Sequence, residues 1–468
     1  MKIAITISRG GTARNILQNV FFEKLKKSAE QIVIFTPAYK DERFISEFGG
    51  DNVKFLPLYP EKYGYLQSVV LKINKFSVFN LNTKRLALYD YVDVSKRNWF
   101  LNFFHNIKYI LLAIVFLPLS KLSFYKSFLI YINGLLIDKE VVSKYRKYFE
   151  EYKLDLVFST SIMESEDAAF IKAAKLSGIK TIGMPKTWDN PSKALFPIQV
   201  DTLVVWSPFM KHQMIHLQGY KEKNINTIGV PQFDYYSDDS YIVSREDFCQ
   251  NMGLDPEKRI IFFGSEGKVI PTDSNITEII VDFIKNGFLI EESQLLIRPH
   301  FCHKNDYEKF SSVLNRNDVV VDSHNNPSKK FRDSWDYSYD QMKHFFNCMY
   351  HSDVIINTCS TLTLDGAAIG KPVVLIMFDG QENDLPIYKS VRRWYVCDYY
   401  KEILSFKSTY LAYSADELKN SINDILENGD KFGKERRELI ERFCYKLDGK
   451  AGERLFDVIS TTYEKIKS

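Results

Sequence analysis

Short β-branched runs alternate with helical periods along this chain, and the alternation occurs twice, which limits the folds open to it. The first series of apolar runs lies at 2–7, 31–37, 52–58, 154–160, 180–185, 201–206 and 224–230. The second series lies at 259–265, 294–300, 318–322, 353–360 and 372–379. Strands that alternate with crossover helices form parallel sheets with helices on their faces. We therefore expect an α/β protein with two Rossmann-like, doubly wound lobes.

A polar stretch with few apolar residues, at 235–247, separates the two series. At roughly 150 residues per domain, a chain of 468 residues has room for two or three domains. We expect an N-terminal lobe at 1–235 and a C-terminal lobe at 236–468 that ends in helices. Such sheets bind ligands beyond the carboxyl ends of their strands, so a cleft between the lobes is the expected site.

Composition excludes several classes of protein. The 62 basic and 59 acidic residues give a net charge of +3, which excludes nucleic-acid binding driven by overall charge. None of the six cysteines forms a CxxC pair, so we expect neither a disulfide framework nor a metal site. The first residues, MKIAITISRGG, lack the apolar segment of a secretion signal. These features predict a cytoplasmic protein.

The segment near 84–147 departs from the rest of the chain, because Lys and Arg are interleaved there with Phe, Tyr, Trp and Leu. Its longest apolar run, Tyr109–Leu119, is shorter than the roughly 20 residues that a spanning helix needs. Helices with an apolar face and basic flanks can lie in a membrane interface. The interpretations are peripheral contact with the inner face of the cell membrane, a buried core helix and a true membrane span.

Two motifs of the first half follow predicted strands. Arg9, Gly10, Gly11 and Arg14 form a turn before a helix, where glycines and the helix N-terminus suit an anionic ligand. A plain turn is the alternative, and the sequence is neither GxGxxG nor a Walker A motif. Glu166 and Asp167 begin a later helix, either as dipole-complementing acids or as a general base.

The loop Lys186–Lys193, KTWDNPSK, follows another predicted strand. Trp188 could stack on a substrate, Asp189 could accept a hydroxyl proton, and Asn190 and Lys193 could bind polar or anionic groups. Because Asn-Pro is also a turn signal, a purely structural loop is the alternative.

Three motifs of the second half are candidates for a nucleotide site, and each follows a predicted strand. Small residues at a turn and cationic or hydroxyl side chains near helix starts suit phosphates. A hydroxyl at such a position is also an ordinary N-cap. The candidates are Gly264, Ser265 and Glu266, then Arg298 and His300, and then Ser360, Thr361 and Asp365.

These second-half motifs resemble the nucleotide-binding lobe of GT-B glycosyltransferases. The resemblance rests on Gly264-Ser265, on RPH at 298–300 and on SDVIINTCSTLTLDGAAIGKPVVLIMFDG at 352–380. RPH with the downstream Ser-Thr also resembles CDP-glycerol glycerophosphotransferases, and TWDNPSK resembles a loop of bacterial surface-polysaccharide transferases. Asp365 departs from the Glu that many GT-B enzymes carry. The resemblance covers roughly residues 150–400.

The resemblance implies a metal-independent glycosyltransferase that needs no cofactor and takes a CMP-, CDP- or UDP-linked donor. The donor would contact the second lobe. A glycan or lipid-linked acceptor would enter at the first lobe, where Asp189, Glu166 or Asp167 could remove its proton. The alternatives are a CDP-glycerol-type polyol-phosphate transferase, a UDP-sugar 2-epimerase and a non-catalytic nucleotide sensor.

Overall fold

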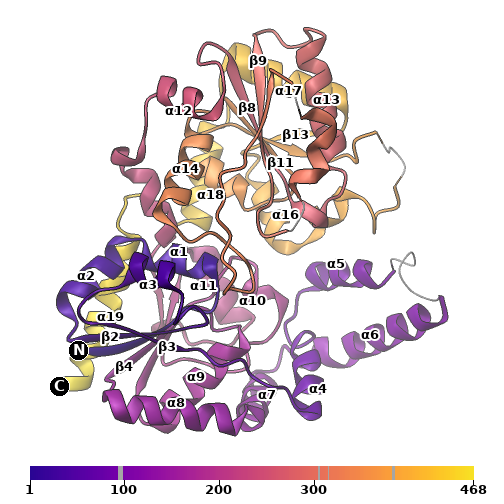
Figure 1. The fold of residues 1–468 in the computed structure, drawn as a ribbon. Helices are drawn as coiled ribbons and strands as arrows, with labels where there is room; N and C mark the ends of the chain where they lie inside the picture. The colour runs from indigo at the N-terminus through magenta and orange to yellow at the C-terminus, as the bar shows by residue number, and fades with distance from the viewer. Residues whose placement is uncertain (93–98, 304–305, 315, 382–384) are drawn as a thin grey trace.

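The computed structural model describes residues 1–92, 99–303, 306–314, 316–381 and 385–468, which form two α/β lobes stacked one above the other (Figure 1). Each lobe is built on one parallel sheet with helices on its faces. The expected α/β architecture of two Rossmann-like lobes is therefore confirmed.

The first sheet has the strand order β3-β2-β1-β4-β5-β6-β7 within the described residues. Its strands are β1 (Lys2–Thr6), β2 (Gln31–Thr36), β3 (Val53–Pro57), β4 (Leu156–Ser159), β5 (Lys180–Gly183), β6 (Thr202–Val205) and β7 (Ile225–Thr227). Its helices are α1 (Gly10–Leu17), α2 (Val20–Ser28), α3 (Glu42–Phe48), α8 (Lys139–Tyr152), α9 (Ser165–Leu176), α10 (Asn190–Lys193) and α11 (Pro208–His216). The strand order reverses direction at β1 and β4, the arrangement that opens a ligand crevice in doubly wound sheets.

The second sheet has the order β10-β9-β8-β11-β12-β13. Its strands are β8 (Arg259–Gly264), β9 (Ser293–Arg298), β10 (Val319–Val321), β11 (Val354–Asn357), β12 (Val373–Ile376) and β13 (Tyr410–Ala412). Its helices are α12 (Arg245–Met252), α13 (Asp273–Lys285), α14 (Tyr339–Tyr350), α15 (Leu362–Ala368), α16 (Asp398–Ser405), α17 (Ala415–Asn428) and α18 (Gly433–Phe443). The sequence pattern did not predict β13, because its residues Tyr410–Ala412 include no Val, Ile or Thr, whereas the equally short β7 and β10 do.

Burial explains why the runs form strands. In β1 and β2 every residue after the first is buried, and β4, β11 and β12 are buried throughout. Strands covered by helices on both faces read as continuous apolar runs of this kind. Several helices start at the side chain of a capping residue: Asn19 caps α2, Asp41 caps α3 and Ser207 caps α11.

Four helices between β3 and β4 form an arm that extends to one side of the first lobe (Figure 1). They are α4 (Tyr65–Asn74), α5 (Leu81–Val92), α6 (Trp99–Leu119) and α7 (Ser123–Leu136). The arm has a small apolar core of its own, which includes Val78, Tyr125 and Leu129. Among the described helices, no single one has both the length and the hydropathy of a membrane span. Asn106–Leu119 and Ser123–Leu136, bent by 117°, meet that test only as a pair.

The last helix, α19 (Ala451–Lys467), leaves the second lobe and packs against α2 of the first lobe. Lys24 of α2 forms an ion pair of 2.8 Å with Glu453. The carboxylate of Asp234 accepts hydrogen bonds from the backbone N–H groups of Ala451 and Gly452, at 3.0 and 2.7 Å. By its packing α19 thus belongs with the first lobe, although its sequence lies in the expected 236–468 lobe.

Candidate active site

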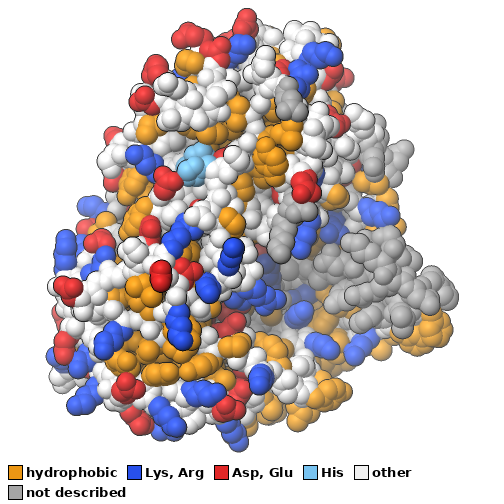
Figure 2. All heavy atoms as spheres, in the orientation of Figure 1, with side chains coloured by type: hydrophobic (Ala, Val, Ile, Leu, Met, Phe, Trp, Pro, Cys, Tyr) orange, Lys and Arg blue, Asp and Glu red, His pale blue; other side chains and the backbone are white. Residues whose placement is uncertain are grey.

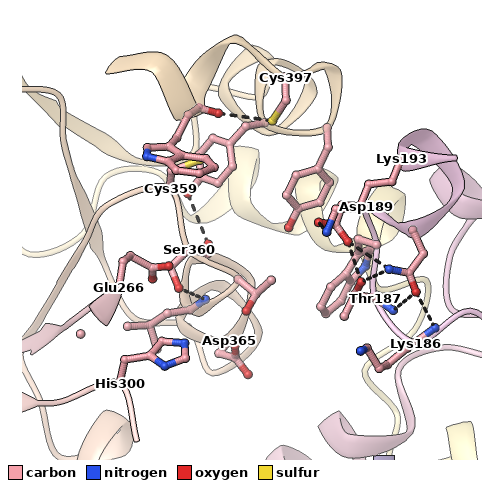
Figure 3. Close-up of a pocket in the computed structure, with 18 of the residues that line it drawn as sticks. Lys186, Thr187, Asp189, Lys193, Glu266, His300, Cys359, Ser360, Asp365 and Cys397 are labelled. Atoms are coloured by element: carbon pink, nitrogen blue, oxygen red, sulfur yellow. Dashed lines mark hydrogen bonds and ion pairs between the residues drawn. The ribbon is translucent and has the colours of Figure 1, made fainter. Parts of the chain in front are cut away.

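The candidate site is a cavity of about 590 Å³ between the lobes, at the carboxyl ends of both sheets (Figure 3). The loop after β5 reaches it from the first lobe, and the turns after β8, β9 and β11 reach it from the second. Most of the residues that the sequence singled out line it together. These are Arg14, Trp188, Asp189, Asn190, Lys193, Gly264, Ser265, Glu266, Arg298, His300, Ser360, Thr361 and Asp365.

The first-lobe wall of the cavity is the loop Lys186–Lys193, which hydrogen bonds and an ion pair within the loop hold in shape. The Asn190 side-chain oxygen accepts from the backbone N–H groups of Lys186 and Thr187, at 3.0 and 3.2 Å. The Asp189 carboxylate accepts from the Thr187 hydroxyl at 2.6 Å and pairs with Lys193 at 2.5 Å. Burial raises the pKa of Asp189, but the Lys193 charge and these hydrogen bonds outweigh it and hold the pKa below its ordinary value. Asp189 is thus a stable anion and a weak proton acceptor.

Trp188 does not offer the stacking face that the sequence predicted. Its side chain is 3% exposed and packs edge-on against Trp206, with ring centroids 4.8 Å apart. Its indole N–H donates to the Phe443 carbonyl of α18 at 2.7 Å. Trp188 therefore ties the loop to the second lobe instead of holding a ligand ring.

The second-lobe wall carries a carboxyl group whose burial favours the protonated form. Burial raises the pKa of Glu266 to about 8, against a hydrogen bond with the Ser360 side chain that lowers it. The two side chains lie next to His300 in Figure 3. At neutral pH Glu266 is therefore mostly a neutral acid that can donate a hydrogen bond.

His300 stands beside Glu266 as a neutral imidazole. Burial and the adjacent His303 ring, stacked with a centroid distance of 4.2 Å, lower the pKa of His300 to about 4. Its Nδ1 is buried and has no hydrogen-bond partner among the described residues. An unprotonated ring nitrogen in a cavity can accept a proton from a substrate hydroxyl.

Asp365 and Arg14 face the cavity from different lobes. Burial raises the pKa of Asp365 to about 6, and its carboxylate accepts from the Tyr236 hydroxyl at 2.6 Å. The Arg14 charge acts in the opposite direction on that pKa, which shows that the two groups are near each other. The Arg14 guanidinium also lies over the Trp335 ring, 5.0 Å from its centroid.

Two predicted donor ligands are already engaged by the protein. Arg298 pairs with the buried Asp322 at 2.5 Å. The Ser265 hydroxyl lies 2.9 Å from Asp273 and 2.8 Å from Asp306, so it organises the turn after β8. Both residues line the cavity, but the side-chain contacts of each are already made by the protein.

Asp322 also belongs to the one group of possible metal ligands found among the described residues, with His344 and Cys348. Its carboxylate already binds Arg298 on one oxygen and His344 on the other, at 2.5 and 3.0 Å. This arrangement satisfies the buried carboxylate without an ion.

Gly10 and Gly11 do not line the cavity, because a carboxylate of the second lobe covers their backbone N–H groups. Gly10 donates to Asp333 at 2.9 Å, and Gly11 donates to the other oxygen of Asp333 at 3.2 Å. A Cβ at Gly10 would lie 2.7 Å from the Trp335 carbonyl oxygen. The glycines therefore allow a close contact between the lobes, and the anion at this helix start is the protein's own.

Arg9, Glu166 and Asp167 also lie outside the cavity. Arg9 pairs with Glu164 at 2.6 Å and with Glu166 at 3.8 Å. Asp167 is fully buried and accepts hydrogen bonds from the Thr6 and Ser159 hydroxyls. The structure gives all three residues internal partners, so none of them is placed to touch a substrate there.

The cavity also has walls that the sequence reading assigned no role. Lys186 is the first residue of the quoted loop motif. The charged residues Asp189 and Lys193 in the same motif could have indicated that Lys186 is also a site residue. Cys359 lies next to Ser360 in the 352–380 motif. Nothing in the local sequence marks Cys397, Trp394, Tyr399 or Trp335, because loops outside the quoted motifs bring them to the cavity. Cys359 adopts a left-handed backbone, with φ of 46°, at the turn before α15. Figure 3 shows Cys359 and Cys397 above Ser360.

Solved structures share the fold at low sequence identity. UDP-GlcNAc 2-epimerase from Neisseria meningitidis aligns with a TM-score of 0.53 and 11% identity, covering 98% of this chain and 100% of that one. UDP-GlcNAc 2-epimerase from Methanocaldococcus jannaschii gives 0.53 and 10%, with the same coverage. A glycosyltransferase from Rickettsia africae gives 0.51 and 12%, covering 100% and 98%. These likenesses establish the fold alone, and no curated protein sequence matches the chain.

A family model is more specific. The model for CDP-glycerol:poly(glycerophosphate) glycerophosphotransferases matches residues 178–461, more than half of the chain. The matched part includes the loop at 186–193 and the complete second sheet. The match confirms the expectation of a transferase with a nucleotide-activated donor, and the family is the one to which the CDP-glycerol-type alternative belongs. The chain belongs to the CDP-glycerol:poly(glycerophosphate) glycerophosphotransferase family.

Proposed function

We propose that this protein transfers a polyol phosphate from a CDP-linked donor to a hydroxyl at the end of a glycan or polyol-phosphate chain. One observation carries the proposal: cationic side chains of the first lobe and proton-handling side chains of the second lobe line one cavity. Arg14, Lys186 and Lys193 come from the first lobe, and Glu266 and His300 from the second. Transfer of a phosphate ester needs both kinds of group near the phosphorus.

The proposed reaction needs few protein groups. The acceptor oxygen attacks the donor's β-phosphorus, a new P–O bond forms, and the bond to the departing CMP oxygen breaks. The acceptor proton goes to the imidazole of His300, which is neutral at pH 7. The neutral Glu266 carboxyl donates a hydrogen bond to a phosphate oxygen, and the lysines balance the phosphate charge. Asp189 holds Lys193 in place; it does not act as the base proposed from the sequence.

CMP release distinguishes this proposal from its rivals. The purified protein is incubated with CDP-glycerol, a CMP-sugar or UDP-N-acetylglucosamine, each with and without a glycerophosphate-chain acceptor. We expect acceptor-dependent CMP release from CDP-glycerol. Sugar transfer from a nucleotide sugar would instead favour the glycosyltransferase that the sequence suggested first. Epimerisation of the UDP-sugar without transfer would favour the 2-epimerase alternative.

The His300→Gln variant tests the base. It should lower kcat by about 100-fold or more while the donor KM changes little, because general-base catalysis contributes roughly that factor. His303→Gln is the matched control, since His303 stacks on His300 but does not line the cavity. Equal kcat losses in both variants would exclude His300 as the base.

We further propose that the arm docks on the membrane that carries the acceptor. Its helices α6 and α7 expose many large apolar side chains, and Figure 2 shows apolar side chains at the edge of the molecule there (lower right). The exposed residues of α7 follow one helix face. The exposed set is Phe100, Phe103, Phe104, Ile107, Ile110, Leu111, Ile114, Val115, Phe124, Phe128, Tyr131 and Leu135. The buried-helix interpretation of this segment does not account for that exposure.

Charge identifies the partner of this surface. Residues 99–136 contain the exposed Lys108 and Lys121, the buried Lys126, and no Asp or Glu. A second copy of the chain would bring like charges together across a symmetric contact. An anionic leaflet instead attracts the exposed lysines and accepts the apolar side chains. We therefore assign the surface to an anionic membrane, and we propose that the protein acts at the inner face of the cell membrane.

Vesicle co-sedimentation tests this assignment. We expect the protein to bind vesicles of phosphatidylcholine with phosphatidylglycerol more strongly than vesicles of phosphatidylcholine alone. The double variant Leu111→Asp, Ile114→Asp should weaken binding by about tenfold or more, because each side chain loses roughly 1.5 kcal/mol or more of apolar burial. Leu176→Asp on α9, 53% exposed, is the control. The proposal would be contradicted if the wild type did not bind vesicles and instead formed a dimer that the double substitution dissociates.

A further inference from the structure

The arm and the loop on the first-lobe wall share one apolar core. Leu195, which follows the Lys186–Lys193 loop, is 2% exposed and packs among Val78, Tyr125 and Leu129 of the arm. The backbone N–H of Leu195 also donates to the Asn74 carbonyl, at the end of α4, at 2.9 Å. The side chain of Asn74 in turn bonds with that of Asn133 on α7, at 3.0 and 3.1 Å. The loop's end is thus packed into the arm.

Helix α5 contacts the loop at a second point. The Lys84 ammonium, in a side chain 6% exposed, donates to the Lys193 carbonyl at 2.8 Å. Burial, with the nearby Lys75 charge, lowers the pKa of Lys84 to about 8, so much of its charge remains at neutral pH. The Lys84 carbonyl accepts from the hydroxyl of Tyr109 on α6 at 3.1 Å. Hydrogen bonds therefore run from α6 through Lys84 to the loop that holds Asp189.

The same helix also reaches the second lobe and the cavity. The Asn82 amide donates to Asp398 of α16, and its oxygen accepts from Lys401 at 3.0 Å. Thr83 and Leu86 of α5 line the cavity. Figure 1 shows α5 beside α16, between the rest of the arm and the second lobe. One helix is therefore connected to the arm, to both lobes and to the cavity.

We infer that contact of the arm with an anionic bilayer sets the position of the 187–195 loop, through Leu195 and the Lys84–Lys193 hydrogen bond. This inference rests on the membrane contact of the proposed function and adds a regulatory role to it. A ligand of the arm changes the loop only if the arm's bound position stabilises one loop arrangement over others. Helices α5 and α6 have the required contacts, because a shift of α6 on the membrane moves the Tyr109–Lys84 pair.

Hydrogen–deuterium exchange tests the coupling without any assumption about the substrate. The full chain is labelled alone, with phosphatidylcholine vesicles, and with phosphatidylcholine–phosphatidylglycerol vesicles. We expect the amides of 187–195, which include the Asn190, Ser192 and Leu195 donors, to exchange several-fold more slowly with the anionic vesicles only. Unchanged exchange of this peptide in vesicle-bound protein would overturn the inference, and so would failure to bind the vesicles.

The Lys84→Met variant separates coupling from binding. It should sediment with anionic vesicles as the wild type does, yet lose the change in exchange at 187–195. Lys180→Met, exposed at the start of β5, is the control and should keep both properties. If Lys84→Met does not fold, Asn82→Ala removes the contact with α16 and should reduce the same change. A full change in exchange in both folded variants would contradict this route.

Turnover then reports on the proposed function separately. Anionic vesicles should raise CMP release from CDP-glycerol in the wild type and leave it unchanged in Lys84→Met. A vesicle-dependent change in exchange with no CMP release from CDP-glycerol would remove the proposed donor and leave the coupling intact. CMP release from CDP-glycerol with unchanged exchange at 187–195 would support the proposed donor and remove the coupling.

Discussion

At the scale of single residues, burial gives two neighbouring groups of the cavity uncommon charge states. Burial disfavours whichever form of a group is charged. It therefore raises the pKa of the Glu266 carboxyl to about 8 and lowers that of the His300 imidazole to about 4. Both groups are neutral between those values, one as a hydrogen-bond donor and the other as a proton acceptor. Asp189 shows the opposite outcome, since Lys193 keeps its carboxylate charged.

These charge states predict the pH dependence of kcat/KM. Activity should rise as pH increases through about 4, where His300 loses its proton, and fall as pH increases through about 8, where Glu266 loses its own. Between pH 5 and 7 the rate should be nearly flat. Glu266→Gln keeps a hydrogen-bond donor that does not ionise, so the fall above pH 8 should disappear in a pH profile of that variant. A fall that persists would assign the upper limb to another group.

At the scale of elements, helix starts and strand ends take partners that lie far away in the sequence. The N–H groups at the start of α1 bind Asp333, from the segment between β10 and α14 of the other lobe. Arg43 of α3 pairs with Asp336 of the same segment at 2.6 Å. The sequence predicted a ligand site at this glycine turn. The turn is instead a contact between the lobes, where only a residue without a Cβ fits.

Gly10→Ala tests that contact. The added Cβ would lie 2.7 Å from the Trp335 carbonyl oxygen, and a backbone atom cannot move away as a flexible side chain can. We expect a loss of roughly 1–3 kcal/mol in the free energy of unfolding, measured by urea denaturation. Gly64→Ala is the control, because nothing lies within 4 Å of its added Cβ. A Gly10→Ala protein as stable as the control would show that the lobes are not held together at this point.

At the scale of the whole molecule, the lobes are joined by more than the linker that the sequence marked. Helix α19 packs on α2 of the first lobe, and Trp188 donates to Phe443 of the second. Helix α5 adds a third connection through Asn82. Trp188 and residues of α5 line the cavity, so its shape depends on how the lobes are held relative to each other.

The sequence by itself determined the two sheets and where the chemistry would gather. Apolar runs of strand length and helical periods are local patterns, and parallel strands place the residues that follow them at one edge. For that reason Asp189, Glu266, His300 and Ser360 meet in one cavity as predicted, although they lie far apart in the chain. The sequence also indicated the exposed apolar face of the arm, through the interpretation that residues near 84–147 contact a membrane.

Only the tertiary structure decided what each group does there. Whether a carboxyl is a base, an acid or an ion-pair partner depends on its burial and on the charges beside it, which come from distant segments. Asp167 is buried and accepts hydrogen bonds from Thr6 and Ser159. Asp189 is paired with Lys193, and Glu266 keeps its proton at neutral pH. The same holds for Gly10 and Trp188, whose partners Asp333 and Phe443 no local pattern could supply. Local patterns set the positions of these residues, and long-range packing sets their charge and their partners.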